Sequence, residues 1–347
     1  MNVAIVCPYD LGRPGGVQDQ VIKLDRWLSD LGHEVTVIGP GTEGPENAIL
    51  LGPTTVVKAN ASSAPISLNP KVRASIDAAV ERSDVVHIHE PLMPTVSLAA
   101  TRITKKPTVG TFHADPPRWA RRGYSAISPV LKKTLSRLDV VTTVSPVSRS
   151  AIRSVVDARL IPNGIDLPSY RHDEKIDGRV VFLGRDDARK GLDVLLTAWH
   201  EVVDLHPGAT LHVVGASRES EIRGVEFLGR VSEDDKIDEL SVAEVFVAPN
   251  LGGESFGIVV AEGMASGAAV VASGIPAFLY VLGDAGEIVA PGDASGLAQR
   301  ISDLLTDADR CSAKGLAGLE RAKQFSGTRV ASMYATAYED ARTLHRS

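Results

Sequence analysis

Short runs of apolar, mostly β-branched residues alternate along this chain with longer segments in which apolar residues recur every three or four positions. The first pattern is typical of buried strands, and the second of helices that bury one face. The pattern predicts strands over residues 3–7, 34–39, 84–89, 108–112, 139–144, 179–183, 210–214, 225–228, 245–248, 268–272 and 287–289. The clearest helix covers residues 17–31, and Gly32 stands where a C-terminal cap is expected.

Strands that alternate with helices predict parallel sheets covered by helices, so the expected fold class is α/β. The strands fall into two sets, separated by Ile161-Pro-Asn-Gly-Ile-Asp166 and a polar stretch, where proline and Asn-Gly interrupt regular structure. We therefore expect two Rossmann-like, doubly wound parallel-sheet domains, over 1–165 and 166–325, with a cleft between them. A length of 347 residues with 44% apolar content suffices for two cores.

Composition narrows the class of protein. The net charge of −6 argues against nucleic-acid binding. Residues 91–138 are the exception, with nine Lys or Arg against the single acid Asp115. Cys7 and Cys311 lie far apart without metal-ligand spacing, and Met1-Asn-Val-Ala-Ile-Val-Cys7 reads as a core strand rather than a signal peptide. We expect a reduced, cytoplasmic protein whose membrane contact, if any, is peripheral.

The most informative segment is Gly252–Gly267, which follows a strand and opens a helix. Free backbone amides at a helix start bind phosphate, here those of Phe256, Gly257, Ile258 and Val259. Glu254 would accept hydrogen bonds from sugar hydroxyls, and Glu262 would reach a second group such as a ribose. The alternative is an ordinary capped helix with two solvated acids.

A second loop carries fixed cations. Arg185 and Lys190 follow the strand at 179–183 and precede a helix. They would neutralise a diphosphate leaving group, at about 4 kcal/mol per contact before desolvation. A solvated basic loop is the alternative. Both loops lie at carboxyl ends of strands, where open α/β sheets bind ligands.

The first half contributes weaker signals. Gly15 and Gly16 open the first helix, where the lack of Cβ lets backbone approach a ligand, although a plain turn explains them equally well. The turn that carries this glycine pair does not read Gly-x-Gly-x-x-Gly, which argues against a dinucleotide oxidoreductase. His113 follows a strand at its carboxyl end, where it could contact a sugar or be purely structural. His87 and His89 are expected on opposite faces of their strand, so they should not share a metal.

In this combination the residues resemble the retaining family-four glycosyltransferases of GT-B architecture. The resemblance spans nearly the whole chain, through Gly15-Gly16, His113, Pro162-Asn-Gly-Ile-Asp166, Arg185 with Lys190, and Glu254-x7-Glu262. Cys7-Pro-Tyr9, Pro14-Gly-Gly-Val-Gln18, His87-Ile-His-Glu-Pro91, Thr111-Phe-His113 and Leu251-Gly-Gly-Glu-Ser-Phe-Gly-Ile258 are similar to actinobacterial phosphatidylinositol mannosyltransferases. Those enzymes move mannose from GDP-mannose to the inositol ring of phosphatidylinositol at the cytosolic face of the plasma membrane.

The resemblance assigns roles by matched motif. It implies catalytic roles for His113, Arg185, Lys190 and Glu254. It implies donor contacts by Gly15, Gly16, Arg185, Lys190, Val231, Glu254, Phe256, Gly257, Ile258, Val259 and Glu262, with Glu262 at the ribose and Val231 at the base. It implies acceptor contacts by Tyr9, Gln18, Asn60 and Ser62. It also implies that the last helix, 326–347, completes the first domain. No metal or cofactor is required, although a divalent cation would be compatible.

The chain departs from these relatives on the acceptor side. The segment Asn69–Ile76 holds only Lys71 and Arg73, fewer cations than a membrane-binding helix of the family. We hypothesise that Arg118, Trp119, Arg121, Arg122 and Tyr124 contact the anionic lipid instead. Three other functions stay open: a family-four enzyme with another donor, such as UDP-glucose, or another acceptor; a sugar-nucleotide epimerase; and a non-catalytic nucleotide- or lipid-binding protein.

Overall fold

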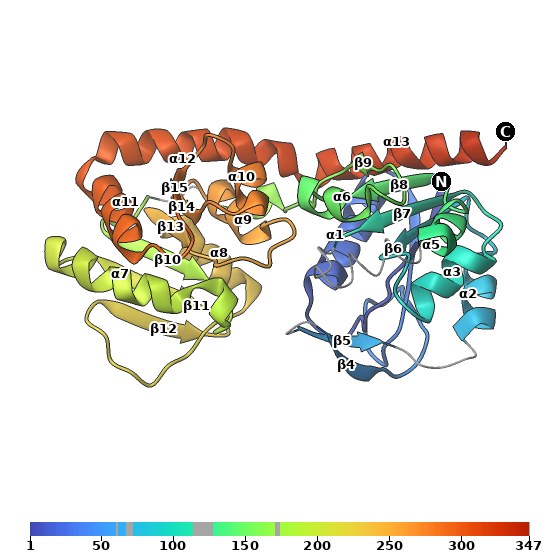
Figure 1. Cartoon of the computed structure of the whole chain (residues 1–347), viewed down its shortest axis with the longest axis horizontal. Coiled ribbons are helices and arrows are strands. Elements are labelled where there is room, and N and C mark those ends of the chain that lie inside the picture. The colour runs from blue at the N-terminus through green and yellow to red at the C-terminus, as the bar shows by residue number, and fades with distance from the viewer. Residues whose placement is uncertain (60–61, 67–71, 114–127, 171–173, 347) are drawn as a thin grey trace. The chain divides into compact units, whose positions relative to one another are not determined.

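The computed structural model describes residues 1–59, 62–66, 72–113, 128–170 and 174–346 (Figure 1). The chain forms two compact units. Unit 1 consists of Met1–Gly164 and Gly327–Ser347, and unit 2 of Ile165–Ser326.

Unit 1 is built on a seven-stranded sheet in the order β3-β2-β1-β6-β7-β8-β9, with all described pairings parallel. Its strands are β1 (Asn2–Val6), β2 (Glu34–Gly39), β3 (Ile49–Leu50), β6 (Val85–His89), β7 (Thr108–Phe112), β8 (Val140–Thr143) and β9 (Arg159–Leu160). An antiparallel pair, β4 (Thr55–Ala59) and β5 (Ser62–Ile66), stands apart from this sheet.

Helices cover both faces of the unit 1 sheet. They are α1 (Gly16–Asp30), α2 (Val72–Val80), α3 (Val96–Ile103), α5 (Ser128–Leu135), α6 (Pro146–Ile152) and α13 (Gly327–His345). Apolar residues of α1 and α13 form one buried cluster with alternate strand residues such as Val85 and Val109. The opposite strand residues, such as Val86 and Ile88, pack with α2, α3, α5 and α6. Figure 1 shows α13, in red, running along the sheet. The last helix of the chain therefore completes the core of unit 1.

Unit 2 has a six-stranded sheet in the order β12-β11-β10-β13-β14-β15, again with parallel pairings. Its strands are β10 (Arg179–Leu183), β11 (Thr210–Val214), β12 (Val225–Gly229), β13 (Val245–Ala248), β14 (Ala269–Ser273) and β15 (Glu287–Val289). Its α-helices are α7 (Leu192–Leu205), α8 (Glu233–Val242), α9 (Ile258–Ala265), α10 (Pro276–Leu282), α11 (Ala294–Thr306) and α12 (Ala308–Ala322). Three 3-10 turns complete it: η1 (Leu167–Ser169), η2 (Ala188–Lys190) and η3 (Lys323–Phe325).

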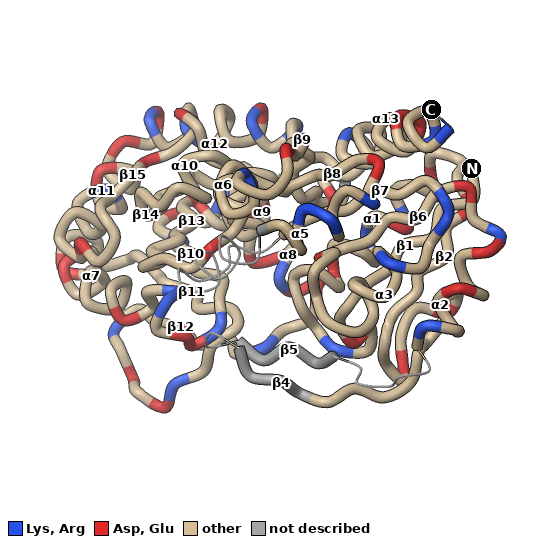
Figure 2. Tube along the Cα trace, turned by 45° about the vertical axis from the view of Figure 1, so that its right-hand side comes forward, with Lys and Arg blue, Asp and Glu red and all other residues tan. Residues whose placement is uncertain are grey.

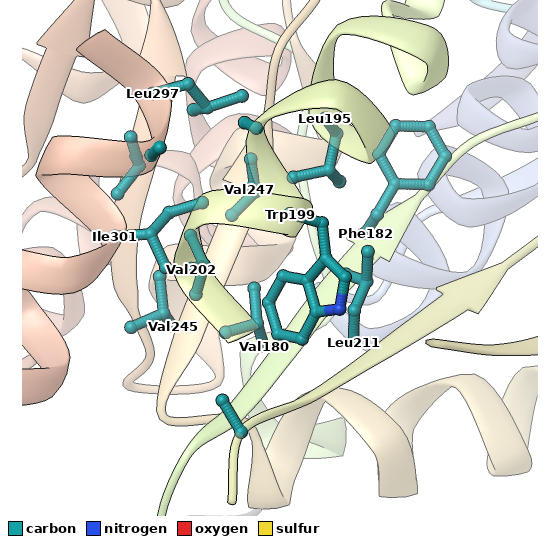
Figure 3. Packing of buried hydrophobic residues seen from close by; sticks show 14 of the residues in the cluster. Val180, Phe182, Leu195, Trp199, Val202, Leu211, Val245, Val247, Leu297 and Ile301 are labelled. Atoms are coloured by element: carbon teal, nitrogen blue, oxygen red, sulfur yellow. The ribbon is translucent and has the colours of Figure 1, made fainter. Parts of the chain in front are cut away.

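The core of unit 2 follows from the apolar strands. Side chains of β10, β11 and β13 meet the inward faces of α7 and α11, with Trp199 at the centre (Figure 3). Trp199 is fully buried, and its indole N–H donates to the carbonyl of Arg223 at 3.0 Å. This apolar layer holds β10 and β13 in place, and the candidate site residues follow the carboxyl ends of these strands.

The predicted fold class is confirmed. Every predicted strand is present, within one residue at either end. Gly32 follows α1 with φ of 83°, a left-handed conformation that favours glycine. Among the described residues, the strands that the apolar pattern did not predict are β3, β9 and the β4–β5 pair. Two-residue strands are too short to show a period, which explains β3 and β9.

The strand order identifies where ligands can bind. In unit 2 the chain proceeds from β10 outward to β11 on one side and later returns to β13 on the other, so β10 and β13 flank a switch point. In unit 1 the corresponding neighbours are β1 and β6. Open α/β sheets bind ligands at the carboxyl ends of such strands.

The chain leaves unit 1 at Gly164 and re-enters it at Gly327, and both glycines lie against the side chain of Trp27. A Cβ on Gly164 would lie 2.5 Å from the Trp27 ring, and one on Gly327 would lie 2.1 Å from it. Gln20 also exchanges two hydrogen bonds with the backbone of Gly164, at 3.0 and 2.9 Å. Glycine at both positions is therefore required by the close approach of Trp27.

The basic segment predicted from composition belongs to unit 1. Its described cations lie on α3, on α5 and in the turns after them, and Figure 2 colours such positions blue along the tube. Lys132, Lys133 and Arg137 are exposed. Among the helices within the described ranges, none combines the length and the apolar character that crossing a bilayer needs.

Candidate functional site

The two loops of unit 2 that were singled out from the sequence lie against each other. The amide of Leu251 donates to the carbonyl of Arg189 at 2.8 Å. Gly191 has φ of 72°, and a Cβ there would lie 2.0 Å from the carbonyl oxygen of Pro249. Only glycine allows this approach, which joins the loop after β10 to the loop after β13.

This packing brings Lys190 and Glu254 together. The Lys190 ammonium lies 2.5 Å from Oε1 of Glu254, and the amide of Asn250 donates to the same oxygen at 2.9 Å. The lysine and glutamate side chains are 17% and 20% exposed, so a ligand can still reach both. Because this ion pair is accessible, a ligand can replace each partner. The ammonium can bind a phosphate in place of the carboxylate, and the carboxylate can accept from a hydroxyl in place of the ammonium.

Arg185 has a different environment from that of Lys190. It is exposed and makes no ion pair with any side chain in the described part of the chain. Its loop is held by neighbours: Arg218 binds Asp186 through two contacts of 2.9 and 2.7 Å and also reaches Asp193 at 2.7 Å. The hydrogen bonds from Arg189 lower the pKa of Asp187 to about 2. The loop is thus ordered while the Arg185 guanidinium stays available.

Helix α9 begins at Ile258, after Gly257 with φ of 102°. The amides of Val260 and Ala261 both bond back to the carbonyl of Gly257, at 3.0 and 3.3 Å. The earlier amides of Ile258 and Val259 therefore have no carbonyl of their own helix to bond. Phe256 is buried against Tyr280 and Phe325, so its side chain anchors the loop.

Glu262 lies one turn into α9 and is buried, with a side chain 6% exposed. Its Oε1 accepts from Lys236 at 2.8 Å and from Tyr170 at 3.0 Å. Burial works to lower the pKa of Lys236, but attraction to Glu262 and Glu233 outweighs it and raises that pKa. Val231, the residue expected at the base, is half-buried in the loop that leads to Lys236.

In unit 1, the adjacent glycines Gly15 and Gly16 have different surroundings. A Cβ on Gly15 would meet the Gln18 side chain at 2.4 Å, whereas one on Gly16 would meet nothing within 4 Å. Gln18 is buried, with its amide donating to the carbonyl of Asp10 at 3.4 Å, and Tyr9 is half-buried. The exposed backbone is therefore that of Gly16, at the start of α1.

The expectation for His87 and His89 is wrong. Their ring centroids lie 4.2 Å apart on one face of the sheet, the face covered by α1 and α13. Side chains of a strand alternate, so residues two apart share a face and only adjacent residues oppose each other. His87 bonds the hydroxyls of Tyr338 at 2.8 Å and Thr111 at 2.6 Å.

His113 joins this cluster. Its Nε2 lies 2.7 Å from Nδ1 of His89, and its backbone amide donates to Oε1 of Glu90 at 2.7 Å. Glu90 adopts φ of 49°, which is unusual for a residue with a Cβ. Burial lowers the pKa of His113 to about 4, against a hydrogen bond with Asn163 that raises it. All three histidines are therefore neutral at pH 7.

Several expected residues cannot be placed. Asn60 and Arg118 lie outside the described residues, as do Trp119, Arg121, Arg122 and Tyr124. Ser62 is the first residue of β5. Across the described ranges, no three His, Cys, Asp or Glu side chains are grouped as a metal site would require.

Sequence reasoning did not anticipate Asn250, Lys236, Tyr170, His89 or Asn163 as partners of the candidate site residues. Asn250 comes two residues after the end of β13, which marks it as a loop residue at the switch point. Lys236 and Tyr170 come from distant elements, and nothing in their local sequence signals contact with Glu262.

Two doubly wound units and the paired cation and acid at a switch point define a class, the GT-B glycosyltransferases. Residues 14–168 match the model described as Glycosyltransferase Family 4, and residues 177–307 match the one described as Glycosyl transferases group 1. The chain belongs to glycosyltransferase family 4.

Individual relatives are more specific. The chain is 36% identical to the phosphatidyl-myo-inositol mannosyltransferase of Mycolicibacterium smegmatis over 88% of this chain and 85% of that protein. It is 32% identical to the protein of the same name from Mycobacterium leprae, over 99% and 98%. Among solved structures, the Anabaena HepE protein in complex with UDP superposes with a TM-score of 0.75 at 18% identity, over 98% of this chain and 100% of that one. That last similarity concerns the fold alone.

Proposed function

We propose that this glycosyltransferase transfers mannose, with retention of configuration, from GDP-mannose to the inositol ring of phosphatidylinositol. The single observation that carries the proposal is the Lys190–Glu254 pair at the switch point of unit 2. A lysine suits the diphosphate, and the carboxylate beside it suits the hydroxyls of the attached sugar. The names of the two mycobacterial relatives support mannose and a phosphatidylinositol acceptor.

Donor binding would occur in unit 2. The diphosphate takes Lys190 and the exposed Arg185, together with the amides of Ile258 and Val259 at the start of α9. Glu254, released from Lys190, accepts from mannose hydroxyls while Asn250 keeps its carboxylate oriented. Glu262 is already fixed by Lys236 and Tyr170 and presents its other oxygen to the ribose. Val231 lies at the base.

The reaction itself would rely on electrostatics and positioning. As the bond from sugar to phosphate breaks, negative charge grows on the diphosphate, where Arg185 and Lys190 stabilise it. The sugar becomes oxocarbenium-like, and the inositol hydroxyl attacks the face that the diphosphate leaves, giving its proton to the departing diphosphate. No cofactor is required in this scheme, since side-chain cations supply the positive charge.

The acceptor side would belong to unit 1. Tyr9, Gln18, Asn60 and Ser62 are proposed to meet the inositol phosphate, and Arg118 with its neighbours the anionic lipid. The enzyme would act as a peripheral protein at the cytoplasmic face of the plasma membrane. Vesicle sedimentation tests this part: if replacing Arg118, Arg121 and Arg122 by serine leaves binding to phosphatidylinositol vesicles unchanged, the lipid contact lies elsewhere.

An acceptor-dependent assay tests the function. Labelled GDP-mannose is incubated with the full-length chain, with and without phosphatidylinositol vesicles, and both lipid and nucleotide products are followed. The proposal expects a labelled lipid and release of GDP only when phosphatidylinositol is present. A lipid product from UDP-glucose instead would identify another donor, and an altered sugar nucleotide formed without acceptor would identify an epimerase.

A further inference from the structure

The buried histidines of unit 1 include one polar atom without a partner. Nε2 of His89 is buried and has no hydrogen-bond partner among the described residues, while Nδ1 of the same ring bonds His113. His89 is 1% exposed. By contrast, both ring nitrogens of His87 are hydrogen-bonded. This difference determines where the protons of the cluster lie.

A neutral imidazole carries one N–H and one lone pair, so one proton lies between His89 Nδ1 and His113 Nε2. If that proton belonged to His113, His89 would carry its own proton on Nε2, as a buried N–H without an acceptor. Such a donor costs about 1–3 kcal/mol. If the proton belongs to His89 Nδ1, the unpaired atom is only a lone pair, which is better tolerated than an orphaned N–H.

A proton on Nδ1 of His89 also determines which nitrogen of His113 is protonated. With Nε2 accepting from His89, the proton of His113 must be on Nδ1, the nitrogen left for Asn163, whose side chain hydrogen-bonds the ring. In this arrangement the amide oxygen of Asn163 would be the acceptor of that N–H. His89, His113 and Asn163 then form one chain of hydrogen bonds with a single direction.

We propose that His89 is a positioning residue of the reaction: its Nδ1–H fixes His113 as the neutral Nδ1–H tautomer in one ring orientation. His113 then offers a ligand only a hydrogen-bond donor, the Nδ1–H that Asn163 holds when no ligand competes. It cannot act as a base through Nε2, because His89 occupies that lone pair. This inference rests on the proposed function for its kinetic part and on the geometry alone for the tautomer.

Nitrogen-15 NMR of the histidine-labelled full-length protein tests the tautomer without any substrate. We expect His113 and His89 to be protonated on Nδ1, each with an unprotonated Nε2. A proton on Nε2 of His113 overturns the proposal, whether or not the protein proves to be a mannosyltransferase. If the tautomers are as expected but no transfer is detected with GDP-mannose, the proposed function fails and this inference survives.

Three variants test the role of His89. His89→Leu removes the donor, and His89→Asn retains an amide N–H near the position of Nδ1. His87→Leu is the matched control, because His87 lies on the same strand and face, is equally buried and bonds other partners. With GDP-mannose and phosphatidylinositol, we expect His89→Leu to lower kcat by about 10–100-fold with little change in the donor KM.

Asparagine at position 89 should restore most of that activity and the Nδ1–H signal of His113. His87→Leu should lower the melting temperature but keep both kcat and the tautomer. Equal loss of kcat in the His87→Leu and His89→Leu variants, at equal loss of stability, would mean that both histidines are merely structural and would refute the proposal.

Discussion

The candidate site of unit 2 and the histidine cluster of unit 1 stabilise their buried polar groups in opposite ways. In unit 2, ionised side chains neutralise each other: Lys190 with Glu254, and Lys236 with Glu262. In unit 1, the histidine cluster is neutral and bonds hydroxyls, an amide and another imidazole. Ion pairs can be exchanged for a charged ligand, whereas a neutral network keeps its own partners. We therefore infer that the site in unit 2 binds a charged ligand, whereas the histidine cluster in unit 1 keeps its side chains in fixed positions.

The largest expected effect comes from removing the exchangeable cation. Lys190→Met should lower kcat/KM by about 10²–10³-fold, because the leaving diphosphate loses a preorganised positive charge. Arg189→Met is the matched control, since Arg189 is already bound to Asp187 at 2.8 Å. It should cost much less. Steady-state mannosyl transfer measures both, and similar losses would mean that general loop charge matters rather than Lys190.

Acid should affect unit 1 next. An unfolded histidine has a pKa of 6.5, whereas burial lowers those of His87 and His113 to about 3 and 4. The unfolded state therefore binds more protons below pH 6.5, so stability is complete above that pH and falls as pH decreases. We expect about 1 kcal/mol per buried histidine between pH 6.5 and 5.5.

Denaturant titrations at these two pH values measure the acid effect. In a Trp199→Phe background the remaining tryptophans, Trp27 and Trp119, both belong to unit 1, so fluorescence follows that unit. The His87→Leu variant in the same background should show a smaller pH effect. Equal stability at pH 6.5 and 5.5 would show that the cluster is protonated or open in the native state.

Breaking the deeper ion pair of unit 2 should have a moderate effect on stability. Glu262→Gln leaves Lys236, which is 14% exposed, with Glu233 as its remaining ion-pair partner. We expect a loss of about 2 kcal/mol, below the full cost of orphaning a buried charge. Chemical denaturation measures it, with Tyr170→Phe as a control that removes one hydrogen bond to Glu262 and should cost about 1 kcal/mol. A larger loss for Tyr170→Phe would contradict the central role of the ion pair.

The smallest effect on stability is expected at Gly16. A Cβ there meets nothing within 4 Å, so Gly16→Ala should change the free energy of unfolding by less than about 0.5 kcal/mol. If the diphosphate approaches this backbone, the donor KM should rise nonetheless. Gly15→Ala is the contrasting variant, because its Cβ would displace Gln18. An unchanged donor KM in Gly16→Ala would remove Gly16 from the donor site.

The sequence predicted the fold well because its parallel strands are buried on both faces and read as continuous apolar runs. It also indicated Lys190 and Glu254, since each lies in a loop that follows a predicted strand. It could not show that they bind each other, because that contact depends on Gly191 meeting Pro249 across two loops. The error at His87 and His89 had another origin: the pattern was present, but its period of two was misapplied.

The partners of the site residues were harder to predict. Asn163 reaches His113, and Tyr170 reaches Glu262, from elements far away in the chain. Such contacts arise from tertiary packing, and no local period or motif encodes them. Residues that bear chemistry were visible in the sequence, whereas those that hold them in place became visible only in three dimensions.

The position of α13 has a consequence for biosynthesis. Tyr338, which bonds His87, and Tyr334, which packs beside it, follow the whole of unit 2 in the chain and are translated after it. Unit 2 is contiguous in the chain and can fold while translation continues. Unit 1 is begun first, but the part of its sheet face that α13 covers stays uncovered until that helix emerges. The nascent chain therefore exposes part of the apolar surface around His87 until unit 2 has been translated.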